Sequence, residues 1–202
     1  PGSPHCNVDE LLASAEKRKA YLNLVESRDM IISALSCHWN PISPDAQIAQ
    51  DSDAVFRKSV ELAEKLGVPT VNVLSGLPSG SPTDTRPNWV TCPWPPHFLD
   101  ILEYQWNEVT IPYWKSIHPL LEEHDVTLGF EMHPGILVYN VHTLLRLREA
   151  AGLRLGCNFD PSHLWWNGVD PVAAIRALGD SIFHVHGKDV YVDPYNTQIN
   201  GC

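Results

Sequence analysis

The chain has 202 residues, of which 44% are hydrophobic, enough for one substantial core and consistent with a single domain over residues 1–202. Its 14 Lys and Arg against 24 Asp and Glu give a net charge of −10, which argues against a nucleic-acid partner. No apolar run approaches the ~20 residues of a membrane span, and five scattered cysteines without a CxxC motif indicate reduced thiols in a cytoplasmic protein.

The predicted secondary structure alternates helices with strands along the chain. Helices are predicted where apolar residues recur at helical spacing, and strands where apolar runs are short and continuous. In chain order these are a helix over residues 8–26, a strand over 30–37, a helix over 51–66, a strand over 69–74, a helix over 98–123, a strand over 126–131, a helix over 141–151, a strand over 153–159, a helix between Asp170 and Gly179, and a strand over 182–186.

Several residues mark the ends and irregularities of these elements. Asn7 suits the N-cap of the first helix with Glu10 as its capping-box partner, and Gly67 suits the C′ position of the second helix. Pro112 predicts a kink in the third helix. Residues 75–96 are rich in Pro, Gly, Ser and Trp, and a loop of this length in a compact domain is usually functional, often a lid.

The alternation predicts an α/β fold built from parallel βαβ units. The strands are continuous apolar runs, as expected when both faces of a sheet are buried. Links from helix to strand are short, whereas links from strand to helix are longer and rich in His, Trp, Asn and acidic residues. This asymmetry is typical of a (β/α)₈ TIM barrel, whose active site lies at the C-terminal ends of the strands. A doubly wound open sheet would place ligands there too, but no GxGxxG or phosphate-binding loop is present.

About five of the eight strands of such a barrel are predicted, and a whole barrel typically needs ~250 residues. The chain starts at Pro1 rather than Met and ends in the loop-like Asn200-Gly201-Cys202. We therefore expect an incomplete barrel, truncated at both ends, with its first and last units missing. Strand edges left unpaired would favour aggregation or a homo-oligomer.

Three successive predicted strands end in groups that can bind a metal ion or move a proton. Because the carboxyl ends of parallel strands share one edge of a sheet, we expect these groups to converge. Side chains two residues apart on a strand point to the same face, so spacing does not choose between the two histidines of the last strand. The groups are Glu131 and His133, then Asp160 and His163, then His184, His186, Lys188 and Asp189.

The motifs Glu131-x-His133-Pro134, Asp160-x-x-His163 and His184-x-His186-x-Lys188-Asp189 resemble those of the xylose isomerase-like TIM barrels, a superfamily that includes the sugar phosphate isomerase/epimerase family. The resemblance covers about residues 7–195. It implies one divalent metal ion (Mn, Mg, Co or Zn) held by Glu131, Asp160 and His186. The family's fourth ligand is a Glu on a strand after His186, which is not found before Cys202. We therefore expect weak metal binding by this chain and activity in a longer parent protein.

The resemblance also implies that the reaction is the isomerisation or epimerisation of a sugar. Such an enzyme removes a proton from the carbon next to a carbonyl, and the metal stabilises the enediolate that forms. The partner is then a small-molecule sugar, with no membrane or nucleic acid involved, and the lack of a phosphate motif favours a non-phosphorylated one. His184 is expected to be a hydrogen-bonded core histidine. The catalytic candidates are Glu131, His163 and Lys188, and the candidates for substrate binding are His133, His38, Asn40 and Trp165.

These assignments have alternatives. Glu131 could cap a neighbouring loop, and Asp160 could form the turn before Pro161. Lys188 could be a solvated loop residue, and Trp165 could pack beneath a loop. The same site could serve a dehydratase or a lyase acting on a keto-sugar or glycoside, and an inactive barrel fragment or binding protein is also open. A DNA-repair nuclease like endonuclease IV is disfavoured by the net charge of −10.

Overall fold

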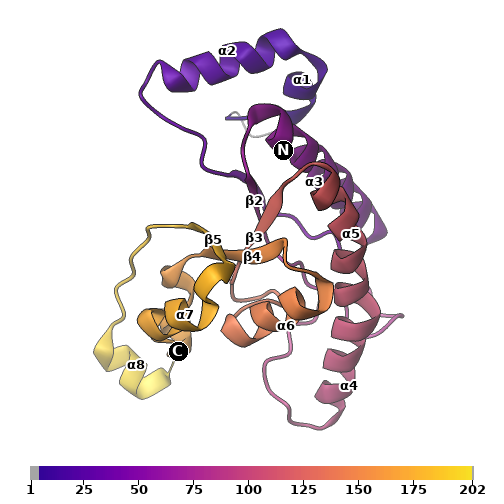
Figure 1. The fold of residues 1–202 in the computed structure, drawn as a ribbon. Helices are drawn as coiled ribbons and strands as arrows, with labels where there is room; N and C mark the ends of the chain where they lie inside the picture. Colours follow the sequence, from indigo (N-terminus) through magenta and orange to yellow (C-terminus); the bar gives the residue numbers. More distant parts are fainter. Residues whose placement is uncertain (1–4, 202) are drawn as a thin grey trace.

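The computed structural model describes residues 5–201 and, for Trp166, the backbone only (Figure 1). Its centre is a parallel sheet in which each strand pairs with the next one along the chain. Sequential order distinguishes a barrel wall from a doubly wound sheet, in which the strand order reverses. The predicted α/β TIM-barrel class is therefore confirmed. The strands are β1 (Leu35–Cys37), β2 (Thr70–Val73), β3 (Thr127–Glu131), β4 (Leu155–Phe159) and β5 (Ile182–Val185).

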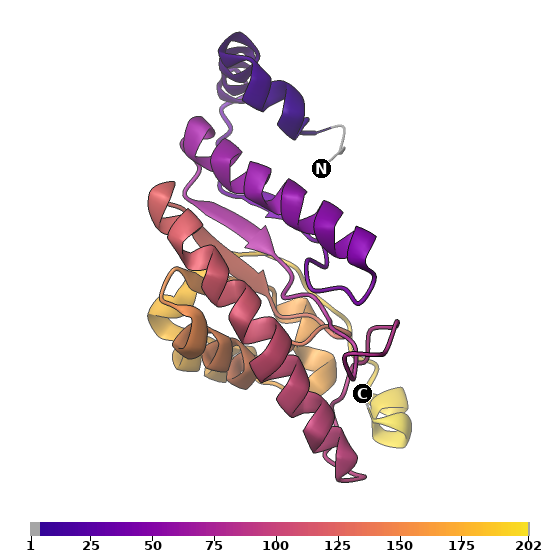
Figure 2. The ribbon, with the colours of Figure 1, turned by 90° about the vertical axis from the view of Figure 1, so that its right-hand side faces the viewer.

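Helices connect the strands and line one side of the sheet (Figures 1 and 2). Contacts join α3 to α5, α5 to α6 and α6 to α7, so each of these helices packs beside the next. The helices are α1 (Val8–Ala13), α2 (Ala15–Glu26), α3 (Ala46–Leu66), α4 (His97–Glu103), α5 (Ile111–Glu123), α6 (Val141–Ala151), α7 (Pro171–Leu178) and α8 (Pro194–Asn200), with a π-helix over Tyr104–Thr110 and 3₁₀ turns over Pro161–His163, Trp165–Asn167 and Gly179–Ser181. None of the described helices is long and apolar enough to cross a membrane.

The other face of the sheet curls inward without closing into a barrel among the described residues. Asn72 of β2 and His184 of β5 belong to strands that are not neighbours, yet Asn72 Nδ2 lies 3.1 Å from His184 Nδ1. Ser33, just before β1, reaches the same ring, with its Oγ 3.0 Å from His184 Nε2. β1 and β5 remain the outer strands of the five. The expected incomplete barrel is thus confirmed.

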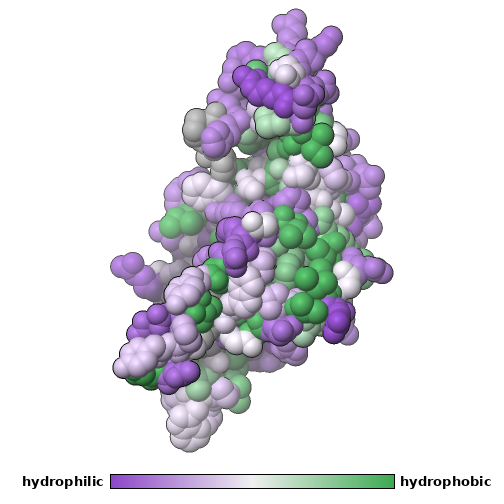
Figure 3. Space-filling model, turned by 90° about the vertical axis from the view of Figure 1, so that its left-hand side faces the viewer, coloured by the Kyte–Doolittle hydropathy of each residue, from purple (hydrophilic) through white to green (hydrophobic). Residues whose placement is uncertain are grey.

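The side of the molecule that carries β5 and α7 exposes apolar side chains. Val185 at the end of β5 is 55% exposed, and Val172 and Ile175 of α7 are 54% and 46% exposed. Figure 3 looks onto this side and shows apolar atoms gathered on part of it. Association through the open strand edges stays a prediction.

The core lies between the sheet and its helices. Every residue of β2 and of β4 is buried, as the continuous apolar pattern predicts. The ring of Trp114 on α5 packs edge-on between Phe56 of α3 and Phe130 of β3, with centroid distances of 5.7 and 4.7 Å. This packing fixes β3, the strand that ends in Glu131.

The first predicted helix is wrong in one respect, because it is two helices that meet at Ser14. The Ser14 backbone is extended, and its hydroxyl accepts a hydrogen bond from the N–H of Lys17 as the N-cap of α2. A serine that caps a new helix competes with continuation of the old one. Asn7 caps α1 as expected, but the Glu10 carboxylate pairs with Lys17 instead of closing a capping box. The strand expected over residues 30–37 is also shorter, since only β1 pairs.

The third predicted helix is interrupted upstream of the expected kink. α4 runs into the π-helix Tyr104–Thr110, and α5 begins only at Ile111. Pro112 lies in the first turn of α5, directly after the π-helix, so the irregularity falls in the residues just before the proline.

The π-helix carries Gln105, which is fully buried beneath the loop over residues 75–96. Its Nε2 donates to the carbonyls of Ser79, at 3.1 Å, and Asn88, at 2.6 Å. Residues 75–80 are themselves buried. The first residues of this loop are therefore held in place by the core. The lid that the length of the loop suggested would have to come from its later, exposed part, which includes the 71% exposed Trp94.

Replacing Gln105 by Leu should lower the free energy of unfolding by about 2 kcal/mol, because it leaves buried loop carbonyls without their donor. Amide hydrogen exchange over residues 75–96 should rise with it, and both can be measured alongside urea unfolding. The matched control is Gln47→Leu on the exposed side of α3, where the Gln47 side chain donates to the exposed Asp51. Equal stability of the two variants would contradict the interpretation that Gln105 holds this loop in place.

Candidate metal-binding and catalytic site

The carboxyl ends of β3, β4 and β5 lie side by side and bring together the groups that the sequence singled out. In the sheet register Glu131 pairs with Asn158 of the neighbouring strand. Asp160 follows β4 and caps the 3₁₀ turn Pro161–His163 with its own side chain. The turn places His163 Nε2 3.0 Å from Glu131 Oε1.

Glu131 and Asp160 are buried, at 4% and 1% exposure, and the protein holds one oxygen of each. Glu131 Oε2 accepts a hydrogen bond from Asn158 Nδ2 at 3.2 Å. Asp160 Oδ1 accepts from the N–H and the hydroxyl of Ser162, at 3.0 and 2.7 Å. The other two oxygens, Glu131 Oε1 and Asp160 Oδ2, share a gap beside His163 Nε2, at 3.0 and 3.4 Å. Two buried carboxylates that share a gap need a positive charge there.

Lys188 and His186 border this gap. Lys188 Nζ lies 2.5 Å from Asp160 Oδ2 and 3.8 Å from Glu131 Oε1. His186 Nδ1 lies 3.3 Å from Glu131 Oε2 and 3.4 Å from Asp160 Oδ2. The Lys188 side chain is 49% exposed and lies outside any helix or strand, so its ammonium can reach the carboxylates or turn to solvent.

Burial and charge set the protonation of these groups. Burial is the largest cause that lowers the pKa of His163 and of His38, so both imidazoles are neutral near pH 7 and offer a lone pair. Burial alone would raise the pKa of Asp160, but hydrogen bonds from Lys188 and Ser162 outweigh it, and the pKa is lowered. The same hydrogen bond to Asp160 raises the pKa of Lys188. The site therefore combines an ionised carboxylate with neutral nitrogen donors.

Glu131, Asp160 and His163 form a group that could hold a metal ion, since one donor atom from each lies within 4.8 Å of the other two. Two carboxylate oxygens and an imidazole nitrogen suit a divalent ion such as Mn²⁺ or Zn²⁺. The sequence suggested His186 as the nitrogen ligand and gave His163 a catalytic role. The structure brings both rings against the two carboxylates.

Two further candidates line the rim of the site. His38 Nε2 lies 3.4 Å from Glu131 Oε2, and the His133 ring packs 4.2 Å from the His163 ring, measured between centroids. Both rings can therefore meet a molecule that enters above the carboxylates.

Asn40 and Trp165 are placed differently. The Asn40 amide donates to the Leu77 carbonyl at 3.0 Å and accepts from the Leu77 N–H at 3.1 Å, so it anchors the base of the loop over residues 75–96. Both ends of the amide are thereby occupied by backbone. Trp165 is partly buried in its 3₁₀ turn, and no described hydrogen bond or ring contact joins it to the carboxylates.

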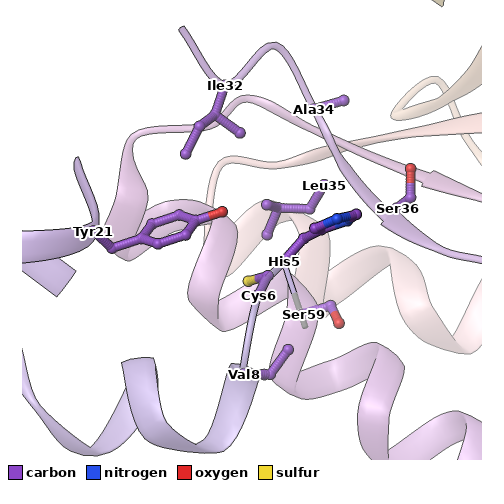
Figure 4. Close-up of a pocket in the computed structure, with 9 residues that line it drawn as sticks. All are labelled: His5, Cys6, Val8, Tyr21, Ile32, Ala34, Leu35, Ser36 and Ser59. Atoms are coloured by element: carbon purple, nitrogen blue, oxygen red, sulfur yellow. The ribbon is translucent and has the colours of Figure 1, made fainter. Parts of the chain in front are cut away.

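A cavity of about 270 Å³ lies beside His38 and is walled by Trp39, Leu77 and Ile136. None of the described residues that line it is Lys or Arg. A separate cavity of about 240 Å³ lies beneath α1 and α2, where Cys6, Tyr21 and Leu35 face it (Figure 4). That second cavity contains none of the site residues.

Asn158 and Ser162 were missed as site residues in the sequence. An Asn in the middle of a buried apolar strand needs a hydrogen-bond partner, and residues 158 and 160 share a face, so this signal was available for Asn158. Ser162 had no comparable signal, because its role depends on the tight turn after Asp160.

Comparisons with known proteins agree with the fold. The model of the family described as xylose isomerase-like TIM barrel matches residues 4–198. The uncharacterized protein YfiH of Bacillus subtilis (strain 168) is 47% identical over 202 residues, which cover 98% of this chain and 64% of YfiH. The chain thus spans less than two thirds of this curated relative.

Solved structures at low identity share the fold. The probable 3-DHS dehydratase AsbF from Bacillus anthracis superposes with a TM-score of 0.66 at 20% identity, over 94% of this chain and 62% of AsbF. An IOLI protein solved with a zinc atom superposes with a TM-score of 0.61 at 16% identity, over 86% of this chain and 58% of IOLI.

Proposed function

The chain belongs to the xylose isomerase-like TIM barrel family, and on that premise we propose that the whole protein is a divalent-metal-dependent isomerase or epimerase of a small sugar. The observation that carries this proposal is the pair of buried carboxylates, Glu131 and Asp160. Each has one oxygen held by the protein and one directed into a shared gap beside His163. Such a pair can help to hold a cation, and a carboxylate oxygen that the cation leaves free can accept a proton.

The proposed metal ligands are Glu131, Asp160 and His186, with His163 Nε2 as a further nitrogen within reach of both carboxylates. When bound, a divalent ion supplies Lewis-acid stabilisation of negative charge on substrate oxygens. The donor set fits this role because the Glu131 and Asp160 side chains are buried, and the ammonium that lies against both of them belongs to the half-exposed Lys188.

Glu131 is the proposed base that takes the proton from the carbon next to the substrate carbonyl. Its Oε1 is the oxygen that Asn158 leaves free, and it faces the gap. His163 and Lys188 lie at the same oxygen and can hydrogen-bond substrate hydroxyls, as can His38 and His133 from the rim. A dehydratase or lyase would share this first step and differ only in what leaves afterwards.

The cavity beside His38 supports an uncharged substrate. Its walls are Trp39, Leu77 and Ile136, and a phosphate would need a Lys or Arg that its described lining lacks. Trp39 is 47% exposed and offers an apolar ring face on which a sugar can stack. The described cysteines are free, which supports a reducing, cytoplasmic setting.

The test is proton exchange, because it requires no knowledge of the product. The full-length protein, loaded with Mn²⁺ or Zn²⁺, is incubated in D₂O with a panel of unphosphorylated ketoses and keto-polyols, and deuterium uptake next to the carbonyl is followed by NMR. Uptake that a chelator abolishes is the expected result. A deuterated product that keeps all the atoms of water in the sugar indicates an isomerase or epimerase. A deuterated product that has lost one water molecule indicates a dehydratase. Failure of the full-length protein to retain a divalent ion would sink the proposal.

A further inference from the structure

Resting on the proposed role of Glu131, we propose that Asn158 is a positioning residue for that carboxylate and that His184 and Ser33 hold the Asn158 amide in the required orientation. Asn158 Nδ2 lies 3.2 Å from Glu131 Oε2, and Asn158 Oδ1 lies 2.9 Å from His184 Nδ1. His184 Nε2 lies 3.0 Å from the Ser33 hydroxyl. The contacts join β3, β4, β5 and the segment before β1 in one line.

Each group in this line has one consistent hydrogen-bonding role. A carboxylate only accepts, so the Asn158 amide must turn its nitrogen to Glu131 and its oxygen to His184. His184 Nδ1 must then carry the proton, and its Nε2 lone pair accepts from Ser33. The orientation of the Asn158 amide and the tautomer of His184 therefore fix each other.

Asn72 fits the same tautomer once its amide is turned. Its Nδ2 lies 3.1 Å from His184 Nδ1, and its buried Oδ1 has no hydrogen-bond partner among the described residues. Half a turn of the Asn72 amide brings that oxygen to the His184 N–H and satisfies it. The two asparagines would then accept from one protonated nitrogen.

This series of hydrogen bonds, from Ser33 through His184 and Asn158, ends at Glu131 Oε2, the oxygen that does not face the gap. Asn158 is fully buried and holds Oε2, while Oε1 remains beside His163 and Lys188. His38 and His186 also approach Oε2, at 3.4 and 3.3 Å, but both are partly exposed. Asn158 is thus the donor that fixes the plane of the carboxylate and aims Oε1.

The strand register explains why these residues meet. Glu131 pairs with Asn158, and Asn158 pairs with His184 after an irregularity between Cys157 and Asn158. Paired residues on adjacent strands point to the same face. Between these two pairs β4 advances by one residue and β5 by two, so the extra residue Phe183 in β5 brings His184 opposite Asn158.

The test compares Asn158→Leu with Leu155→Val, a mild change on the opposite face of the same strand, in the full-length protein. Mn²⁺ affinity is measured by isothermal titration, and the ring nitrogens of His184 are observed by ¹⁵N NMR in the metal-free protein. We expect affinity to fall about 10-fold in Asn158→Leu and to stay unchanged in Leu155→Val. The NMR spectrum of the wild type should show the Nδ1–H tautomer, which Asn158→Leu should lose.

A second pair of variants separates positioning from packing. Asn at position 184 can keep an N–H near the place of Nδ1, whereas Leu cannot, so His184→Asn should retain most of the affinity that His184→Leu loses. Unchanged Mn²⁺ affinity in Asn158→Leu, or an Nε2–H tautomer of His184, would overturn this inference and leave the proposed function standing. A wild-type protein that binds no divalent ion would overturn both.

Discussion

Replacing Glu131 by Gln in the full-length, metal-loaded protein is expected to slow deuterium exchange next to the substrate carbonyl by about 10³-fold, the range of a lost general base. Gln keeps the size of the side chain, but its amide accepts no proton. The contacts around residue 131 also become less favourable. Asn158 and His163 approach the two different oxygens of Glu131, whereas an amide has only one acceptor oxygen. The rate is measured by NMR in D₂O.

The control for this variant is Glu123→Gln, which removes the same charge from the exposed end of α5. Its exchange rate should equal that of the wild type. If Glu131→Gln also kept the wild-type rate, Glu131 would not be the base, and the catalytic proposal for this strand end would fail.

Replacing Asp160 by Asn is expected to weaken Mn²⁺ binding by about 100-fold or more, an effect at the upper end of those for groups around a metal. The Asn oxygen can still accept from Ser162, but an amide nitrogen would then stand where Asp160 Oδ2 meets Lys188 at 2.5 Å. A donor would face a donor, and one of the two buried negative charges would be gone. Affinity is measured by titration with Mn²⁺ detected by electron paramagnetic resonance.

Asp51→Asn on the exposed side of α3 is the matched control, since Asp51 there bonds only Gln47. It changes the net charge equally and should leave Mn²⁺ affinity unchanged. An Asp160→Asn protein with wild-type affinity would remove Asp160 from the ligand set.

The order of elements was predictable because it depends on local patterns. Continuous apolar runs predicted β2 to β5, and Asp170-Pro171 and Gly179 predicted both ends of α7. The prediction was wrong where a residue is compatible with two local structures. Ser14 was read as a position within one helix, although its hydroxyl caps a second. Pro112 signalled an irregularity in the third helix, but the sequence did not show that it would take the form of a π-helix over Tyr104–Thr110.

The residue types of the site were also available from sequence, because ionisable groups at the ends of buried strands are rare and need partners. The sequence could not show which atoms of these side chains contact one another. The alternation of side chains along a strand put His184 and His186 on one face. The structure showed that His184 meets Asn158 Oδ1, whereas His186 lies against Asn158 Nδ2 and the carboxylates. Asn40 looked like a substrate group until the loop brought Leu77 to both ends of its amide.

By itself, then, the sequence determined a parallel α/β barrel wall with carboxylates and histidines at three successive strand ends, because each of these features is visible in a short local stretch of the chain. The tertiary structure decided that one oxygen of Glu131 and one of Asp160 are held while the others share a gap with His163. That decision depends on strand register and on a tight turn after β4, which join residues about 30 positions apart to within hydrogen-bonding distance, a scale that local pattern does not reach.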